Sequence, residues 1–249
     1  MNSPAYPGSS ISKLQALKNS AKSFVDSFNE STDRFALIKF SSSATVLYKV
    51  TDPFVKADLK SKIDSLTAGS WTSMQAGFVY GRKQGIAAKL LTPPRKPVIV
   101  IITDGAPTYN MVENEPSNPD TPVYPSALRS CINAVGGSDA HDYLYALAEH
   151  DLVLNDGILV YSIGVGNEDP VKTSAFQTIG NADLLKDIFL KNAANDFAKG
   201  RNNLTFPCVN TFTRNNGRPT GEYLQTPDAL ELTYLFSRVQ RSILARINQ

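Results

Sequence analysis

Oxygen-bearing side chains stand at three places in the sequence where they would suit a metal ion. Thr72 lies in a polar loop, Asp104 follows an apolar run, and Ser9 and Ser10 stand near the N-terminus. A carboxylate combined with hydroxyls is the ligand set of hard cations such as Mg²⁺, Ca²⁺ or Mn²⁺. Mg²⁺ usually keeps several waters, which leaves a coordination position for a carboxylate from outside. Such a site would bind a partner that presents an acidic side chain.

Short apolar runs predict the strands that would position these residues. The runs 35–40 and 44–48 are joined by three serines and predict a hairpin. The runs 98–102 and 157–163 are apolar on both faces, which is typical of strands buried inside a parallel sheet. A further short strand is expected around 204–206.

Helical spacing of apolar residues separates these strands. The helices are expected over 11–28, 55–66, 74–88, 143–150, 183–198 and 229–247. Alternating strands and helices predict a three-layer α/β fold, in which helices flank a mostly parallel sheet. Ligands bind such folds at the carboxyl ends of the strands, where Asp104 falls.

A single domain over residues 1–249 is expected, because no linker divides the chain and 42% of its residues are hydrophobic. The stretch at about 107–138 is rich in Pro, Asn and Ser and shows no clear helical spacing. It is long for a connection without secondary structure, so we interpret it as a functional loop or an insertion.

Charge and hydropathy argue against two classes of partner. The 25 basic and 23 acidic residues are spread along the chain and give a net charge of +2, so nucleic-acid binding is not expected. Apolar runs such as 98–102 are far shorter than the ~20 residues that cross a bilayer. The first residues also lack the basic and apolar pattern of a secretion signal.

The two cysteines, Cys131 and Cys208, are far apart and do not form a C-x-x-C pair. This spacing argues against a redox motif or a zinc site. Two interpretations remain open, namely two buried thiols or one disulfide in an exported protein.

Five motifs resemble the von Willebrand factor type A (vWA) family, in the family's order. They are Lys13-Leu14-Gln15-Ala16-Leu17-Lys18, Phe40-Ser41, Gly69-Ser70-Trp71-Thr72-Ser73-Met74, Ile101-Ile102-Thr103-Asp104-Gly105 and Ile163-Gly164-Val165-Gly166. The resemblance covers roughly residues 1–199 and the last helix. It implies a Rossmann-like fold and a non-enzymatic, adhesion-type module that binds a protein.

The resemblance also implies a set of site residues. The family's metal-ion-dependent adhesion site combines a D-x-S-x-S motif after the first strand with a Thr in a second loop and an Asp in a third. Thr72 and Asp104 match the second and third parts and are the implied metal ligands. Their neighbours Trp71, Ser73 and Gly105 are the implied partner contacts, and Mg²⁺ is the implied ion, with Mn²⁺ or Ca²⁺ as alternatives.

The first part of that site has no match in this sequence. Met1 resembles the last residue of the motif, so we expect the first strand, one Asp and two Ser ligands to be missing. The family places this strand centrally, so two neighbouring strands would keep unpaired backbone groups, at ~1–3 kcal/mol for each buried group. Against a total stability of ~5–15 kcal/mol this loss is severe, so residues 1–249 are expected to fold poorly alone. Metal binding should be weak or absent.

Other interpretations of the same residues remain open. Asp104 can be a turn residue before Gly105, Thr72 an N-cap, and Trp71 a packed side chain. A metal-free vWA scaffold is one alternative function. A Mg²⁺-dependent phosphohydrolase is another, although Thr103 and Asp104 lack the second carboxylate of the D-x-D pattern.

The resemblance extends to bacterial vWA proteins of the pilus-assembly group. By that analogy we expect a location at the cell envelope or outside the cell. An anchor upstream of residue 1 would agree with such a location, and so would a bridge between Cys131 and Cys208.

Overall fold

The structure is a computed structural model that describes residues 1–6, 8–69, 71–135, 138–166, 208, 221–226 and 228–247. Its helices are α1 (Lys13–Asp26), α2 (Lys56–Asp64), α3 (Met74–Lys89), α4 (Met111–Asn114), α5 (Ser126–Val135), α6 (Ser138–Asn155) and α8 (Leu232–Ile247), the last preceded by the 3₁₀ turn η2 (Ala229–Glu231). Its strands are β1 (Leu37–Phe40), β2 (Ala44–Tyr48), β3 (Val98–Thr103), β4 (Leu159–Val165) and β5 (Tyr223–Thr226).

The described strands form two separate sheets. Strands β3, β4 and β5 form a parallel sheet in that order, with Val98 opposite Leu159 and Ser162 opposite Tyr223. Strands β1 and β2 form an antiparallel hairpin, as expected. Within the described ranges, β1 and β3 each have a hydrogen-bonded neighbour on one side only. Among the described strands, β1 and β3 are therefore not hydrogen-bonded to each other.

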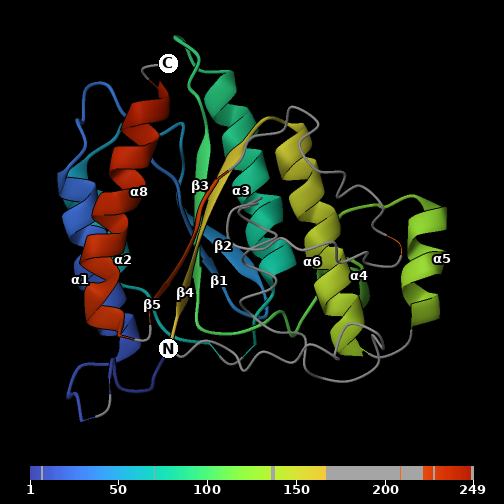
Figure 1. The fold of residues 1–249 in the computed structure, drawn as a ribbon. Coiled ribbons are helices and arrows are strands. Elements are labelled where there is room, and N and C mark those ends of the chain that lie inside the picture. Colours follow the sequence, from blue (N-terminus) through green and yellow to red (C-terminus); the bar gives the residue numbers. More distant parts are fainter. Residues whose placement is uncertain are drawn as a thin grey trace.

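Helices cover both faces of the strands. Figure 1 shows α1, α2 and α8 on one side and α3 and α6 on the other, with α4 and α5 beyond them. Strand β4 alternates between the two layers, because Val160 packs with α3 and α6 while Tyr161 and Ile163 pack with α1 and α8. The three-layer α/β fold expected from the sequence is confirmed.

The helices expected over 11–28, 55–66, 74–88, 143–150 and 229–247 are all present, within a few residues at their ends, apart from α6, which is much longer. Strand β5 was not anticipated, because its four residues do not form an apolar run. The expected helix over 183–198 and strand at 204–206 lie outside the described residues.

The stretch 107–138 has more regular structure than its composition suggests, since it contains α4 and α5. Buried polar side chains bind it to the core. The Gln75 side chain, on the first turn of α3, accepts a hydrogen bond from the Met111 backbone at 2.7 Å and donates one to the Tyr124 hydroxyl at 2.9 Å. The Asn110 side chain caps α4 and donates to Asp142 on α6 at 2.6 Å. The sequence does not reveal these contacts because they join residues more than 30 positions apart.

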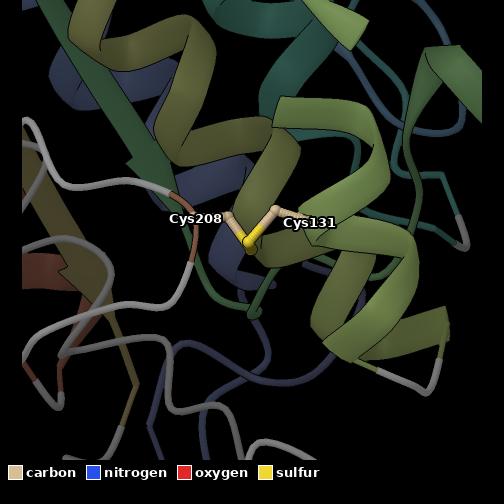
Figure 2. Close-up of a disulfide and its surroundings, with 2 residues drawn as sticks. All are labelled: Cys131 and Cys208. Atoms are coloured by element: carbon tan, nitrogen blue, oxygen red, sulfur yellow. A yellow bond between two sulfur atoms is a disulfide. The ribbon is translucent and has the colours of Figure 1, made fainter. Parts of the chain in front are cut away.

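Cys131 on α5 forms a disulfide with Cys208, and their Cα atoms are 5.4 Å apart (Figure 2). Of the two interpretations that the sequence left open, the disulfide is the one in the structure. It joins α5 to a residue 77 positions later in the chain.

None of the described helices is long and apolar enough to span a membrane.

Candidate metal and partner-binding site

Three loops meet where β1 and β3 end. The backbone N–H of Ser73, before α3, donates to the Ser41 carbonyl after β1 at 2.6 Å. The backbone N–H of Thr72 donates to the Thr108 hydroxyl, and the backbone N–H of Thr108 donates back to the Thr72 carbonyl, both at 3.0 Å. These bonds hold the Thr72 loop between the loops that follow β1 and β3.

The turn that follows β3 is not built on the Asp104 side chain. The Thr103 hydroxyl makes the turn instead, since it accepts from the Gly105 backbone N–H and donates to the Gly105 carbonyl, both at 3.1 Å. The Asp104 side chain is 23% exposed. Its carboxylate is therefore not committed to the turn and remains partly exposed.

Thr72 and Asp104 lie in the same small region. A Cβ atom placed on Gly105 would come within 3.2 Å of the Thr72 hydroxyl oxygen, so this hydroxyl lies against the residue that follows Asp104. The N-cap of α3 is Ser73, whose hydroxyl accepts from the Ala76 backbone N–H at 3.4 Å. The Thr72 hydroxyl is thus not the helix cap that the sequence left open.

Two positive charges stand at this edge of the sheet. The α-ammonium group of Met1 forms an ion pair with the Asp104 carboxylate. The ammonium group of Lys13 lies near Gly166, which follows β4, at 2.9 Å from the position that a Cβ atom would occupy there. A divalent cation at Asp104 would have to displace the Met1 ammonium group, and this competition lowers its affinity.

The three implied partner contacts differ in exposure. Trp71 is 56% exposed, which agrees with a contact surface and not with the packed alternative. Gly105 is partly exposed, whereas Ser73 is fully buried and serves as the α3 cap. Ser73 therefore has a structural role, and Trp71 and Gly105 remain candidates for contact.

The available ligands are of the type that a hard cation prefers, but there are only a few of them in the described residues. Asp104 offers a carboxylate and Thr72 a hydroxyl, and both are oxygen ligands of the type that Mg²⁺ takes. The described part of the chain has no group of three or more His, Cys, Asp or Glu side chains that would hold a metal ion. Ser9 does not add a further metal ligand, because its hydroxyl is already hydrogen-bonded to the Ile11 backbone.

Sequence reasoning missed two residues that shape the site. The sequence places Ser41 in a hairpin turn, yet its carbonyl fixes the Thr72 loop, and a Cβ atom on Gly69 would clash with its side chain. Thr108 was an unremarked loop residue, and its hydroxyl holds the Thr72 backbone. The family resemblance at Phe40-Ser41 pointed to Ser41, whereas no feature of the sequence pointed to Thr108.

Several solved structures share this fold. The vWF domain of the type V pilus tip protein Mfa5 from Porphyromonas gingivalis matches with a TM-score of 0.54 and 16% identity, over 95% of this chain and 90% of that one. The pilus adhesin SpaC from Lactobacillus rhamnosus GG matches with a TM-score of 0.58 and 16% identity, over 93% of this chain and 28% of that one.

Proximal thread matrix protein 1 from the mussel byssus, with zinc in its MIDAS motif, matches with a TM-score of 0.51 and 16% identity. The match covers 91% of this chain, which spans 42% of the mussel protein. No curated protein matches the sequence.

The sequence itself also matches a family model, in addition to the similarity of fold. The model for the von Willebrand factor type A domain matches residues 8–195, which is well over half of the chain. This range includes the Thr72 loop, β3 and Asp104, so the match and the site geometry concern the same part of the molecule. The chain therefore belongs to the von Willebrand factor type A domain family.

Proposed function

We propose that this chain is a non-enzymatic protein-binding module that holds a divalent metal ion at Asp104 and Thr72. The observation that supports the proposal is the position of the Thr72 hydroxyl against Gly105, the residue that follows the partly exposed Asp104. Asp104 would provide the charged ligand and Thr72 a neutral one. Water would fill the remaining positions, one of which an acidic side chain of the partner would take.

Exposed residues beside the metal ligands would supply the rest of the contact. Trp71 is in the same loop as Thr72, and exposed aromatic residues are frequent at the centres of protein interfaces. Gly105 lacks a side chain, so a partner can approach Asp104 closely on that side. Mg²⁺ is the proposed ion, with Mn²⁺, Ca²⁺ or Zn²⁺ as the ions to compare with it.

The proposed location is the cell envelope or the cell exterior. The Cys131–Cys208 disulfide supports it, because disulfides persist in oxidising compartments. Two of the proteins that share this fold are pilus proteins, and the proposed location agrees with theirs.

Titration calorimetry with Mg²⁺ and Mn²⁺ tests the metal site. It compares residues 1–249 with a chain that also carries the residues its gene encodes upstream, each with and without Asp104→Ala. We expect binding that Asp104→Ala abolishes and that Asp58→Ala, which removes an exposed carboxylate on α2, leaves unchanged. Binding that is equal in both variants would overturn the assignment of Asp104.

A metal-free scaffold is the second candidate function, favoured by the Met1–Asp104 ion pair and the small donor set. If neither chain binds metal and partner capture survives EDTA, this candidate replaces the first. A metal-dependent phosphohydrolase is the candidate from another class. Turnover of p-nitrophenyl phosphate with Mg²⁺ that is lost in Asp104→Ala would favour it.

A further inference from the structure

A continuous chain of hydrogen bonds runs from the start of α4 to a carboxyl group on α6. The backbone N–H of Met111, the first residue of α4, has no acceptor within that helix and donates to the Gln75 side-chain oxygen at 2.7 Å. The Gln75 amide donates to the Tyr124 hydroxyl at 2.9 Å, and this hydroxyl donates to the Glu149 carboxylate at 3.1 Å. We call the three side chains the Gln75–Tyr124–Glu149 relay.

The relay is buried where α3 and α6 pack side by side (Figure 1). None of its three residues is more than 6% exposed, and Met111 is buried as well. Hydrogen bonds are electrostatically stronger in such surroundings than in water, and each bond in a chain polarises the next. A change of charge at Glu149 is therefore expected to act on the bond at the Met111 end.

Every donor in the relay points toward Glu149. Burial, together with the nearby Glu149 charge, raises the pKa of Tyr124 well above its usual value, so the Tyr124 hydroxyl keeps its proton and remains a donor. The last bond of the chain thus ends on a carboxylate, and hydrogen bonds to an ionised acceptor are stronger than neutral ones. The direction of the bonds therefore fits the ionised form of Glu149.

The protonated form of Glu149 fits the same surroundings less well. Among the described residues, its charged and titratable neighbours are Arg82 of α3, which lies 3.6 Å from Oε1, the Tyr124 hydroxyl at Oε2, and Asp156 after α6. Arg82 and the Tyr124 hydroxyl are both hydrogen donors. A proton on Oε1 would face Arg82, and a proton on Oε2 would face Tyr124. Protonation therefore displaces one of these contacts and removes the charge that strengthens the other.

The Met111 end of the relay lies close to the Thr72 loop in the sequence and in space. Met111 comes three residues after Thr108. Thr108 accepts from the Thr72 backbone N–H through its hydroxyl and donates its own backbone N–H to the Thr72 carbonyl, both at 3.0 Å. A shift of the Met111 backbone is therefore passed to Thr108 and from there to Thr72.

We propose that the Gln75–Tyr124–Glu149 relay is a pH-sensitive control of the loop that carries Thr72. The ionised carboxylate strengthens the relay and holds residues 108–111 against α3, whereas protonation weakens it and loosens the contacts between Thr108 and Thr72. Burial raises the pKa of Glu149, so the change occurs at a higher pH than for an exposed glutamate. The effect on partner binding rests on the proposed function of the Thr72 loop, but the relay itself does not.

An NMR titration of the ¹⁵N-labelled protein tests this proposal, with EDTA present so that metal binding has no influence. The backbone amide signals of Met111 and Thr72 should both shift with pH, with the same inflection as the Glu149 side-chain carboxyl. Glu149→Gln keeps the shape of the side chain and cannot titrate. In this variant both amide signals should stay near their low-pH wild-type positions at every pH, because the neutral amide resembles the protonated carboxyl group.

Tyr124→Phe separates the relay from a through-space effect of the Glu149 charge. This variant removes the hydroxyl and keeps the ring, which stacks on Tyr145 with 5.5 Å between the ring centroids. Glu149 should still titrate, but the amides of Met111 and Thr72 should no longer follow it. Tyr145→Phe removes a neighbouring hydroxyl outside the relay and is the matched control, so its titration should be that of the wild type.

Three results would overturn the proposal. The first is a Met111 amide that follows Glu149 in Tyr124→Phe as it does in the wild type. The second is a pair of shifts that persists in Glu149→Gln and is lost in Glu113→Gln, which would assign them to the carboxyl group on α4. The third is a shift at Met111 without one at Thr72. Failure of metal binding, measured separately, would bear on the proposed function and leave these shifts unchanged.

Discussion

The hydroxyl oxygen of Thr72 lies against Gly105, within 3.2 Å of the place where a Cβ atom would stand on that glycine. This contact joins the loop before α3 to the end of β3. It brings the Thr72 hydroxyl against the residue that follows Asp104, although Thr72 and Gly105 are 33 positions apart in the sequence.

Replacement of Thr72 by valine should weaken Mn²⁺ or Mg²⁺ binding about tenfold, because losing one polar contact costs about 1–1.5 kcal/mol. Valine keeps the shape of threonine, and the backbone bonds of Thr72 to Thr108 remain. Titration calorimetry measures the change. Thr51→Val, at an exposed position, is the matched control, and the same affinity in both variants would exclude the Thr72 hydroxyl as a ligand.

Acetylation of the Met1 amine should strengthen metal binding by residues 1–249. The modification removes the positive charge that pairs with Asp104, so the incoming cation no longer has to displace it. The same titration of acetylated and unmodified protein provides the comparison. Weaker binding after acetylation would show that the Met1 amine is not a competitor of the metal.

Replacement of Glu149 by glutamine should change how stability depends on pH. Glu149 is 2% exposed, and burial raises the pKa of its carboxyl group, although Arg82 and the Tyr124 hydroxyl oppose the rise. The folded protein therefore keeps this proton to a higher pH than the unfolded chain does. The stability that results is fully present below the unfolded pKa of about 4.3 and is lost as the pH rises through the folded pKa.

Urea unfolding of the wild type and Glu149→Gln between pH 4 and pH 8 provides the measurement. The free energy of unfolding of the wild type minus that of the variant should fall as the pH rises and then level off. Subtracting the variant removes the contributions of the other carboxyl groups. A difference that is constant, or that grows with pH, would contradict the raised pKa.

Loss of the Cys131–Cys208 disulfide should lower the free energy of unfolding by about 2–4 kcal/mol, because the bridge restricts the unfolded chain. Urea unfolding with and without dithiothreitol measures this loss. The double variant Cys131→Ala and Cys208→Ala should match the reduced wild type and show no response to the reductant. A reduced protein as stable as the oxidised one would mean that the bridge contributes little.

Gly85→Ala should destabilise the protein by about 1–3 kcal/mol, since overpacking a core has a cost of this size. A Cβ atom there would come within 2.6 Å of the Ile158 Cδ1 atom, and Ile158 is fully buried. Helix propensity alone predicts the opposite sign, a gain of about 0.5–1 kcal/mol. Thermal or urea unfolding distinguishes the two.

Ile158→Val provides the matching control because it removes the clashing Cδ1 atom. By itself it should cost about 0.5–1.5 kcal/mol. In the Gly85→Ala background it should cost less or restore stability. Strictly additive effects would show that the two side chains do not meet.

Local patterns in the sequence determined most of the elements and the identity of the candidate ligands. The doubly apolar run at 98–102 marks a buried strand, and the Asp-Gly pair ends it, so Asp104 falls at the carboxyl end of β3. The spacing of apolar residues likewise locates α1, α3 and α8. These signals are local, because strand and helix periodicity and turn residues depend on neighbours in the sequence.

The tertiary structure decided the relationships between distant segments. In the folded protein Cys131 and Cys208 form a disulfide instead of two free thiols. Ser73 is buried whereas Trp71 is exposed, and Asp104 forms an ion pair with the Met1 amine. The tertiary structure also left β1 and β3 in separate sheets, with a cavity lined by residues of both strands. Each of these features depends on contacts between segments that are distant in the sequence. Local residue patterns do not specify such contacts by themselves.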